Sequence, residues 1–129
     1  IKTLLGRKRR FDMWEPRDSW GERAYSLSEA HAQYPKQELK RAYTHTAMNA
    51  LIQGSSADIT KSAMIKIYEA GLLDEIDLKL TVHDELDFSV NKDKQKCFEE
   101  SLHIMKNCVD LKVPLKVDVE KGKNWGTIK

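Results

Sequence analysis

Residues 78–90 read LKLTVHDELDFSV, and this stretch decides the fold class. Apolar and polar side chains alternate over residues 78–82 and again over 86–90, with the period of two that is expected of half-buried strands. Almost nothing separates the two runs, so we predict an antiparallel hairpin over residues 77–90. Because helical patterns lie on both sides of it, we predict an α+β fold in which a mostly antiparallel sheet, including this hairpin, packs on two long helices.

The first long helix is predicted over residues 37–70. Apolar or small residues recur there at steps of three and four and define one buried stripe, made of Met48, Ile52, Ser55, Ile59, Ala63 and Ile67. Gly71 is a natural stop for the helix. Gly54 costs about 1 kcal/mol relative to Ala in mid-helix, so we expect a bend or the close approach of another backbone there.

Residues 91–129 are predicted to form a helix, a strand and a tail. Asn91 is the expected N-cap of the helix. Its apolar face repeats at steps of four, three and four and consists of Phe98, Leu102, Met105 and Val109. We predict a last strand over residues 115–119, followed by a tail that contains glycine and Trp125.

The first 36 residues predict short and irregular elements. Residues 1–11 form two extended stretches hinged near Gly6, which belong to a basic hairpin over 1–14. A variable connection over 15–36 follows. Turns are expected over 14–21, where the breakers are Pro16, Asp18, Ser19 and Gly21. A short helix is expected over 28–34, with Ser28 as N-cap and Pro35 after its end.

The composition is that of a folded, water-soluble protein. Of 129 residues, 40% are hydrophobic and 33% are charged. No apolar run approaches the length of a membrane span, and no charged-then-apolar leader opens the sequence. We therefore expect no membrane partner and a cytoplasmic location. Cys97 and Cys108 are eleven positions apart on one predicted helix, too far for a disulfide, so we expect both to be reduced.

The net charge of +2 hides a local cluster of basic residues. Residues 1–14 contain five basic side chains against Asp12 alone, namely Lys2, Arg7, Lys8, Arg9 and Arg10. Such a cluster is suited to phosphate groups. Taken alone, the cluster is better explained as an exposed hairpin that charge keeps soluble.

The turn of the predicted hairpin carries two adjacent acids, Asp84 and Glu85. Tight turns favour Gly or Asn because φ becomes positive there, yet no glycine occurs between Gly71 and Gly122. Two neighbouring carboxylates repel each other, and a divalent cation such as Mg²⁺ removes that conflict. Taken alone, an acidic turn is more often ordinary solvated surface.

Four segments resemble family A DNA polymerases, the family of bacterial DNA polymerase I. VHDEL at 82–86 resembles motif C, and NALIQGSSAD at 49–58 resembles the long palm helix. TLLGRKRR at 3–10 is similar to the stretch that precedes this helix. VPL at 113–115 and GKNW at 122–125 look like the last strand and the tail. The order is that of the family, which implies that residues 1–129 are the C-terminal portion of a palm domain. Residues 12–43 match less well and look like phage-type variants.

The resemblance implies a metal-dependent reaction. Family members transfer nucleotides with two Mg²⁺ ions held between carboxylates from two separate motifs. By position, Asp84 matches the metal-ligating aspartate of motif C, and Glu85 matches the acid that supports it. His83 matches a residue near the primer terminus, although a turn histidine that is hydrogen-bonded locally is an equal alternative.

The resemblance also implies contacts with primer–template DNA. Asn49 and Gln53 are four positions apart, so they share one helix face, and amides of this kind can read the minor-groove acceptors common to every correct base pair. Without the resemblance, an ordinary polar helix face is the simpler interpretation. His45 stands where many cellular members have an arginine. Arg7 and Arg9 are candidate phosphate contacts.

Motif A, with the other metal-binding aspartate, and motif B, which binds the incoming nucleotide, are absent from the sequence. We therefore expect this chain to be part of a DNA-directed DNA polymerase and to be inactive alone. Its partners would be DNA, deoxynucleoside triphosphates and the remainder of the polymerase, on the same or another chain, in a bacterial or phage-infected host cytoplasm. The alternative is a non-catalytic DNA-binding module or remnant derived from a palm.

Overall fold

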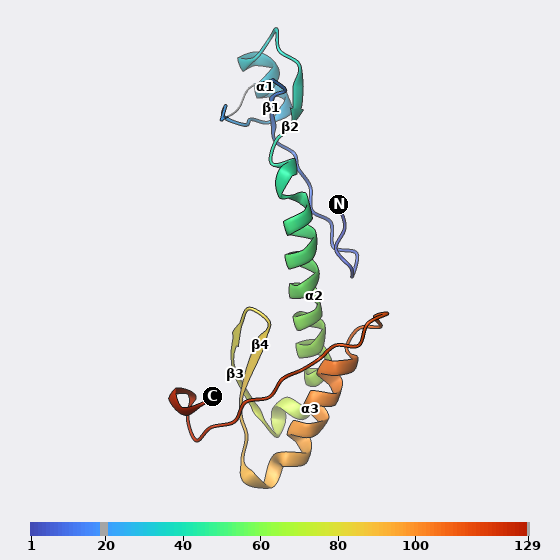
Figure 1. Ribbon diagram of the computed structural model, residues 1–129, viewed down its shortest axis with the longest axis vertical. Coiled ribbons are helices and arrows are strands. Elements are labelled where there is room, and N and C mark those ends of the chain that lie inside the picture. The colour runs from blue at the N-terminus through green and yellow to red at the C-terminus, as the bar shows by residue number, and fades with distance from the viewer. Residues whose placement is uncertain (19–20, 129) are drawn as a thin grey trace. The chain divides into compact units, whose positions relative to one another are not determined.

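The computed structural model describes residues 1–18 and 21–128 and confirms the α+β fold class (Figure 1). Within these residues, three α-helices accompany two separate two-stranded sheets, and both sheets are antiparallel. Ser19, predicted as a turn breaker, and Lys129, in the predicted tail, lie outside the described residues. The chain divides into two compact units, residues 1–56 and residues 57–129, with the boundary inside one helix. No described helix is long and apolar enough to cross a membrane.

The first unit contains a small sheet that the sequence did not predict. Strand β1 (Trp14–Pro16) pairs with strand β2 (Leu39–Arg41). Turns at the start of 14–21 and helix over 37–46 were therefore wrong predictions. The two strands satisfy their backbone donors and acceptors by pairing with each other. A pairing between distant segments leaves no periodic pattern in the local sequence. Tyr43 then adopts a φ of 61° before a short 3-10 turn, η1 (Thr44–Thr46), and this left-handed residue prevents the long helix from starting earlier.

Helix α1 (Leu27–Gln33) begins one residue before the predicted range and is capped by Ser26 rather than Ser28. The backbone nitrogen of Ser26 donates to Glu29 Oε2 at 3.2 Å, and its hydroxyl donates to the same oxygen at 2.7 Å. These hydrogen bonds lower the pKa of the Glu29 carboxyl below its ordinary value. Ser26 takes the cap because Glu29 stands three residues later, the spacing of a capping box.

Residues 1–9 form a hairpin that is shorter than the predicted one over 1–14, because Trp14 belongs to strand β1. Lys2 and Lys8 are bridged in antiparallel fashion, and the nitrogen of Thr3 donates to the carbonyl of Arg7 at 2.9 Å. Gly6 has a φ of 88°, which explains why glycine stands at the hinge.

The long helix α2 extends from Ala47 to Glu69. Its predicted buried stripe is correct only in the second half. Ala63 and Ile67 are 3% and 0% exposed, whereas Met48 and Ile52 are 66% and 62% exposed. The periodicity was right, but a stripe is buried only where a neighbouring segment covers it, and nothing within residues 1–18 or 21–56 covers Met48 and Ile52.

The core of the second unit forms where the end of α2 meets the end of helix α3 (Gln95–Asn107). Ser62 Oγ donates to the Cys108 carbonyl at 3.3 Å, and the Cys108 thiol lies 3.7 Å from the Ile59 carbonyl oxygen. Burial raises the pKa of the Cys108 thiol. Cys97 and Cys108 are both free thiols, as predicted. Leu72, in the 3-10 turn η2 (Leu72–Asp74), and Ile76 complete this core.

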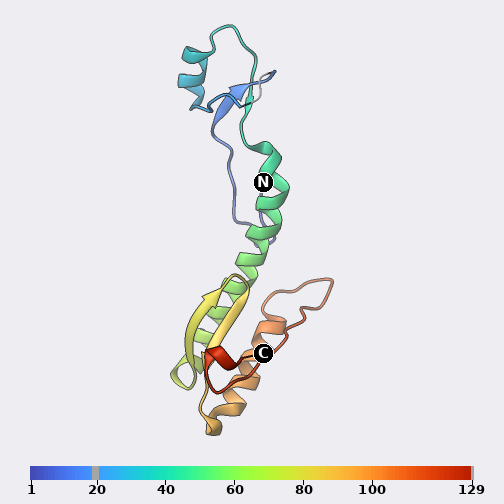
Figure 2. The same ribbon diagram turned by 60° about the vertical axis from the view of Figure 1, so that its left-hand side comes forward.

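The predicted hairpin is confirmed as strands β3 (Asp77–Val82) and β4 (Glu85–Ser89). It lies beside α3 in both ribbon views (Figures 1 and 2), and the ring centres of Phe88 and Phe98 are 6.1 Å apart in an edge-to-face contact. This contact joins the hairpin to α3.

The alternation of the hairpin is interrupted by a bulge between Leu78 and Leu80. Leu78 pairs with Phe88, but Leu80 pairs with Asp87, so one extra residue stands on β3. Paired side chains share a face, so Leu80 lies on the face opposite Leu78, contrary to the even alternation of the sequence. Leu80 is accordingly 44% exposed.

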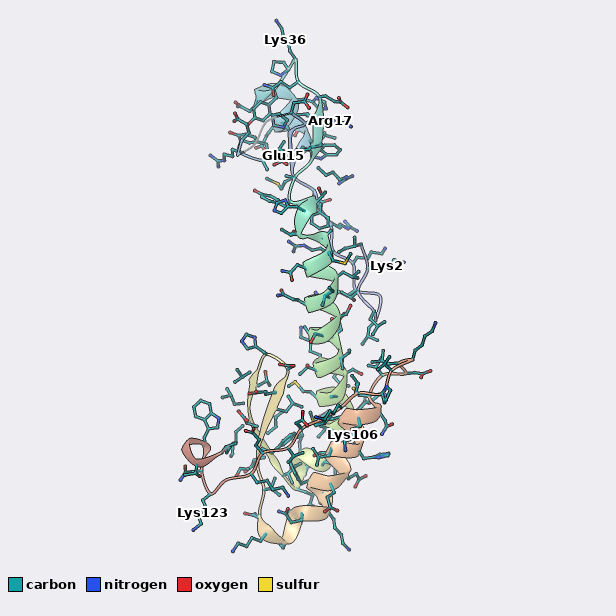
Figure 3. All side chains as sticks on the ribbon, viewed as in Figure 1. Lys2, Glu15, Arg17, Lys36, Lys106 and Lys123 are labelled. Carbon is teal, nitrogen blue, oxygen red and sulfur yellow. The ribbon has the colours of Figure 1, made fainter. Side chains whose placement is uncertain are left out.

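The segment after the hairpin differs from the prediction in two places. Asn91 precedes a 3-10 turn, η3 (Lys92–Lys94), and α3 begins only at Gln95. Residues 115–119 form no strand, because no described segment offers them backbone hydrogen bonds. The tail ends in a short turn, η4 (Trp125–Thr127), and the side chain of Lys123 just before it extends into solvent (Figure 3).

Candidate functional site

The acidic turn is the two-residue loop of the β3–β4 hairpin. Val82 pairs with Glu85, which leaves only His83 and Asp84 to reverse the chain. His83 adopts a φ of 54°, a conformation that costs a non-glycine residue about 1 kcal/mol. Histidine tolerates this region better than most residues. The turn therefore presents Asp84 at its tip and Glu85 at the first position of β4.

The carboxylates of Asp84 and Glu85 are exposed and uncompensated. Neither side chain makes a hydrogen bond or ion pair with any residue of 1–18 or 21–128, and the same is true of His83. Hard carboxylate oxygens without partners fit Mg²⁺, which takes one or two carboxylates and fills its other positions with water and phosphate oxygens. Among the described residues, no group of three or more His, Cys, Asp or Glu side chains is arranged to hold a metal ion.

The amide pair lies on the other unit, on the N-terminal half of α2. Asn49 and Gln53 are both exposed, and their spacing of four places them on one face of the helix, as predicted. His45 is exposed in η1, directly before α2. Met48 and Ile52 border the amides, so this side of the helix combines polar groups with uncovered apolar side chains.

Arg7 is engaged inside the first unit. Its Nη2 donates to the carbonyl oxygen of Gly54 at 3.0 Å, and its backbone nitrogen donates to Thr3 Oγ1 at 3.0 Å. The nitrogen of Leu4 donates to Ser55 Oγ at 2.9 Å. The N-terminal hairpin is thereby fixed to α2 at Gly54. Of the expected bend or close approach of another backbone, the structure shows a close approach, made by the side chains of Thr3 and Arg7.

Gly54 is required by this contact. A Cβ at Gly54 would lie 2.9 Å from the Thr3 methyl carbon and 3.1 Å from Arg7 Nη2. Sequence reasoning missed the roles of Thr3 and Ser55. The signal available was Gly54 itself, because a mid-helix glycine indicates that something approaches the backbone.

Arg9 lies on the exposed part of the hairpin, with its guanidinium carbon 5.9 Å from the centre of the Phe11 ring. The sequence analysis did not single out Asp87. Its Oδ2 atom is buried and has no hydrogen-bond partner among the described residues. No signal in the sequence indicates this, because Asp87 stands at a polar position of the alternation over residues 86–90.

Comparison with known proteins places these features in one family. The model of "DNA polymerase family A" matches residues 1–127. The chain is 46% identical over 102 residues to a DNA-directed DNA polymerase of Pseudomonas phage M6, covering 78% of the chain and 14% of that protein. It is 35% identical over 135 residues to DNA polymerase I of Synechocystis, covering 97% of the chain and 13% of that protein. It is 40% identical over 103 residues to DNA polymerase theta of Drosophila melanogaster, covering 72% of the chain and 5% of that protein. No solved structure matches.

Proposed function

The chain belongs to DNA polymerase family A, and from that membership we propose that it supplies part of the active site of a DNA-directed DNA polymerase. The reaction is template-directed nucleotidyl transfer in DNA replication, and the substrates are primer–template DNA and deoxynucleoside triphosphates. One observation carries this proposal: Asp84 and Glu85 are exposed and unpaired at a corner where His83 adopts a positive φ. Backbone strain beside uncompensated charge is typical of functional sites.

In this proposal Asp84 ligates Mg²⁺ and Glu85 supports the same site. Both offer the oxygen donors that this cation prefers. When bound, a pair of Mg²⁺ ions activates the primer 3′-hydroxyl and stabilises the triphosphate and the departing pyrophosphate. The turn presents only these two acids, so the remaining protein ligands come from the remainder of the polymerase, which also carries the motif A and motif B functions.

The N-terminal half of α2 is the proposed DNA-facing surface. Asn49 and Gln53 donate from their amide groups to minor-groove acceptors of the primer–template, which are present in every correct pair, so the contact senses pair geometry rather than sequence. His45 extends this surface by one turn, and His83 lies near the primer terminus. Arg9 meets backbone phosphate, whereas Arg7 acts by holding the hairpin on α2 through its contact with the Gly54 carbonyl oxygen.

In this proposal, residues 1–129 are the C-terminal portion of a palm domain. Its parts are the basic hairpin (1–14), the connection (15–36), the segment that contains the palm helix α2 (37–70), the motif C hairpin (77–90) and the final part (91–129). The chain spans between 5% and 14% of the length of the three relatives described above, so the complete reaction belongs to a larger assembly. We place that assembly in a bacterial or phage-infected cytoplasm.

Primer extension by the complete polymerase that carries this chain tests the proposal. Asp84→Asn should lower kcat by roughly a hundredfold or more, because a metal that stabilises transition-state charge contributes several kcal/mol. Glu85→Gln should lower it less. Asp110→Asn makes the same chemical change at an exposed site of the same unit and should leave the rate unchanged.

DNA affinity, measured in parallel, separates the proposal from its alternative. A polymerase site predicts that Asp84→Asn strongly reduces extension while DNA binding is kept or slightly strengthened, since one negative charge is removed. If extension continues at the original rate with Asp84→Asn, the turn holds no catalytic metal. A chain that binds DNA in an assembly without extension activity would be the non-catalytic module.

A further inference from the structure

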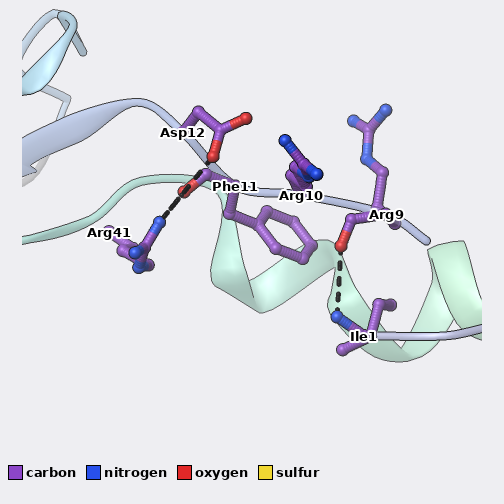
Figure 4. Close-up of a pocket in the computed structure, with 6 residues that line it drawn as sticks. All are labelled: Ile1, Arg9, Arg10, Phe11, Asp12 and Arg41. Atoms are coloured by element: carbon purple, nitrogen blue, oxygen red, sulfur yellow. Dashed lines mark hydrogen bonds and ion pairs between the residues drawn. The ribbon is translucent and has the colours of Figure 1, made fainter.

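A pocket of about 460 Å³ lies in the first unit (Figure 4). Six residues line it, namely Ile1, Arg9, Arg10, Phe11, Asp12 and Arg41. Three of them carry a guanidinium group and one carries a carboxylate. The pocket is therefore a basic site, and neither Arg10 nor Arg41 has been given a role so far.

Arg41 lies on one side of this pocket and is held there by several contacts. It is the last residue of β2, paired with Trp14 of β1, and its guanidinium carbon lies 4.8 Å from the centre of a ring of Trp14. Its Nη1 donates to the carbonyl oxygen of Phe11 at 2.7 Å and lies 4.0 Å from a carboxylate oxygen of Asp12. Asp12 thus balances the charge of Arg41, and the pair fixes the course of residues 11 and 12.

Arg9 and Arg10 have no such compensation. Their side chains make no hydrogen bond or ion pair with any residue in the described part of the chain. Figure 4 shows both guanidinium groups projecting to the same side of the segment. The ring of Phe11, 5.9 Å from the guanidinium carbon of Arg9, lies between these arginines and Arg41.

Two neighbouring, unpaired guanidinium groups concentrate positive charge at the mouth of the pocket. The planar guanidinium fork matches the oxygens of phosphate, and it is less strongly hydrated than an ammonium group. An adjacent aromatic ring offers a face for a sugar or a base, a combination typical of surfaces that follow a nucleic-acid backbone.

We propose that this pocket binds a phosphodiester of the DNA backbone, with Arg9 and Arg10 as the phosphate ligands and Arg41 as the residue that positions the segment carrying them. The site rests on the proposed function for the identity of its ligand, but its binding requires no polymerase chemistry. It adds Arg10 as a ligand to the phosphate contact proposed above for Arg9, and it gives Arg41 a positioning role.

The test is DNA affinity measured by fluorescence anisotropy over a series of salt concentrations, on the full protein that carries this chain. The probes are a labelled single strand and a labelled duplex of the same sequence. Arg10→Ala should weaken binding by roughly tenfold at low salt, as expected for a lost charge-assisted hydrogen bond to phosphate. The slope of log K against log salt should fall by about one, because one fewer counterion is released.

Two further variants make the result specific. Arg10→Lys keeps the charge but loses the fork, so the salt slope should stay unchanged while affinity falls by less than in Arg10→Ala. Lys36→Ala removes one positive charge from the exposed loop between α1 and β2, at the edge of the same unit (Figure 3), and should change affinity less than twofold. Thermal unfolding curves that match those of the unsubstituted protein exclude a folding defect.

A loss on the single strand, on the duplex or on both supports the site and identifies which form of DNA supplies the phosphate. The inference is overturned if Arg10→Ala weakens binding no more than Lys36→Ala, or if the salt slope is unchanged on both probes. Failure of the proposed function is a separate result: it would appear as extension that survives Asp84→Asn, whatever Arg10→Ala does to DNA affinity.

Discussion

Asp87 is a residue whose environment in the fold cannot be read from the strand pattern around it. It lies on β4 opposite Leu80, on the hairpin face away from the contact between Phe88 and Phe98. Its Oδ2 atom is buried without a partner among the described residues, and an unpaired buried oxygen is unfavourable. The residue is therefore a local cost to the stability of the second unit.

We predict that Asp87→Val raises the free energy of unfolding by about 1 kcal/mol, because it removes the unsatisfied oxygen and adds a residue suited to a strand. Urea denaturation measures the change. Ser89→Val is the matched control, since Ser89 is an exposed position on the same face of the same strand and reports the strand preference alone. An equal gain from both variants would show that the Asp87 carboxylate costs nothing.

At the scale of elements, the contact between helix α2 and the N-terminal hairpin depends on Gly54, because a side chain at that position would collide with the hairpin. In an exposed helix, Gly→Ala stabilises by about 1 kcal/mol. Here the added Cβ would meet the Thr3 methyl carbon at 2.9 Å, so the hairpin has to move away from the helix and give up the hydrogen bonds that fix it.

We predict that Gly54→Ala lowers the melting temperature instead of raising it, and that Thr3→Ser restores much of the loss. Serine keeps the hydroxyl that accepts from the nitrogen of Arg7 and removes the clashing methyl. Thermal unfolding of the two single variants and the double variant forms a cycle. Additive effects in that cycle would mean that the methyl of Thr3 is not what Gly54 accommodates.

The two sheets differ in how far the sequence predicts them. The β3–β4 hairpin is predicted by alternation, because both of its strands are close in sequence and half-buried. The β1–β2 pair has three residues on each strand, separated by more than twenty positions. Pairs so short and so far apart leave no periodic signal, which is why residues 37–46 resembled the start of a helix.

At the scale of the whole molecule, the chain carries the acidic turn of the β3–β4 hairpin and several uncovered apolar side chains. Met48 and Ile52 are more than 60% exposed beside the amide pair. Relatives are many times longer than this chain, and the described residues contain no grouping of acids able to hold a metal by itself.

We therefore predict that the isolated chain does not extend a primer in the presence of Mg²⁺, even at high concentration. A gel-based extension assay with a labelled primer measures this, and the complete polymerase serves as the positive control. Extension by the isolated chain that disappears with Asp84→Asn would contradict the prediction, because it would show that these residues suffice for the whole site.

The sequence by itself determined the α+β class, the hairpin with Asp84 and Glu85 at its corner, and the segments that resemble family A polymerases. These features are local: alternation, helical period and short motifs are set by neighbours in the chain. Sequence also indicated that Gly54 marks either a bend or the close approach of another backbone, without saying which.

Only the tertiary structure decided which faces are buried and which side chains meet. It placed the positive φ at His83, turned Leu80 to the other face through a bulge, and left Met48 and Ile52 exposed. It also placed Arg10 and Arg41, which are 31 positions apart in the sequence, in the lining of one pocket. Burial and pairing depend on a partner segment, and a pattern of residue types specifies what a segment can pack against but not what reaches it.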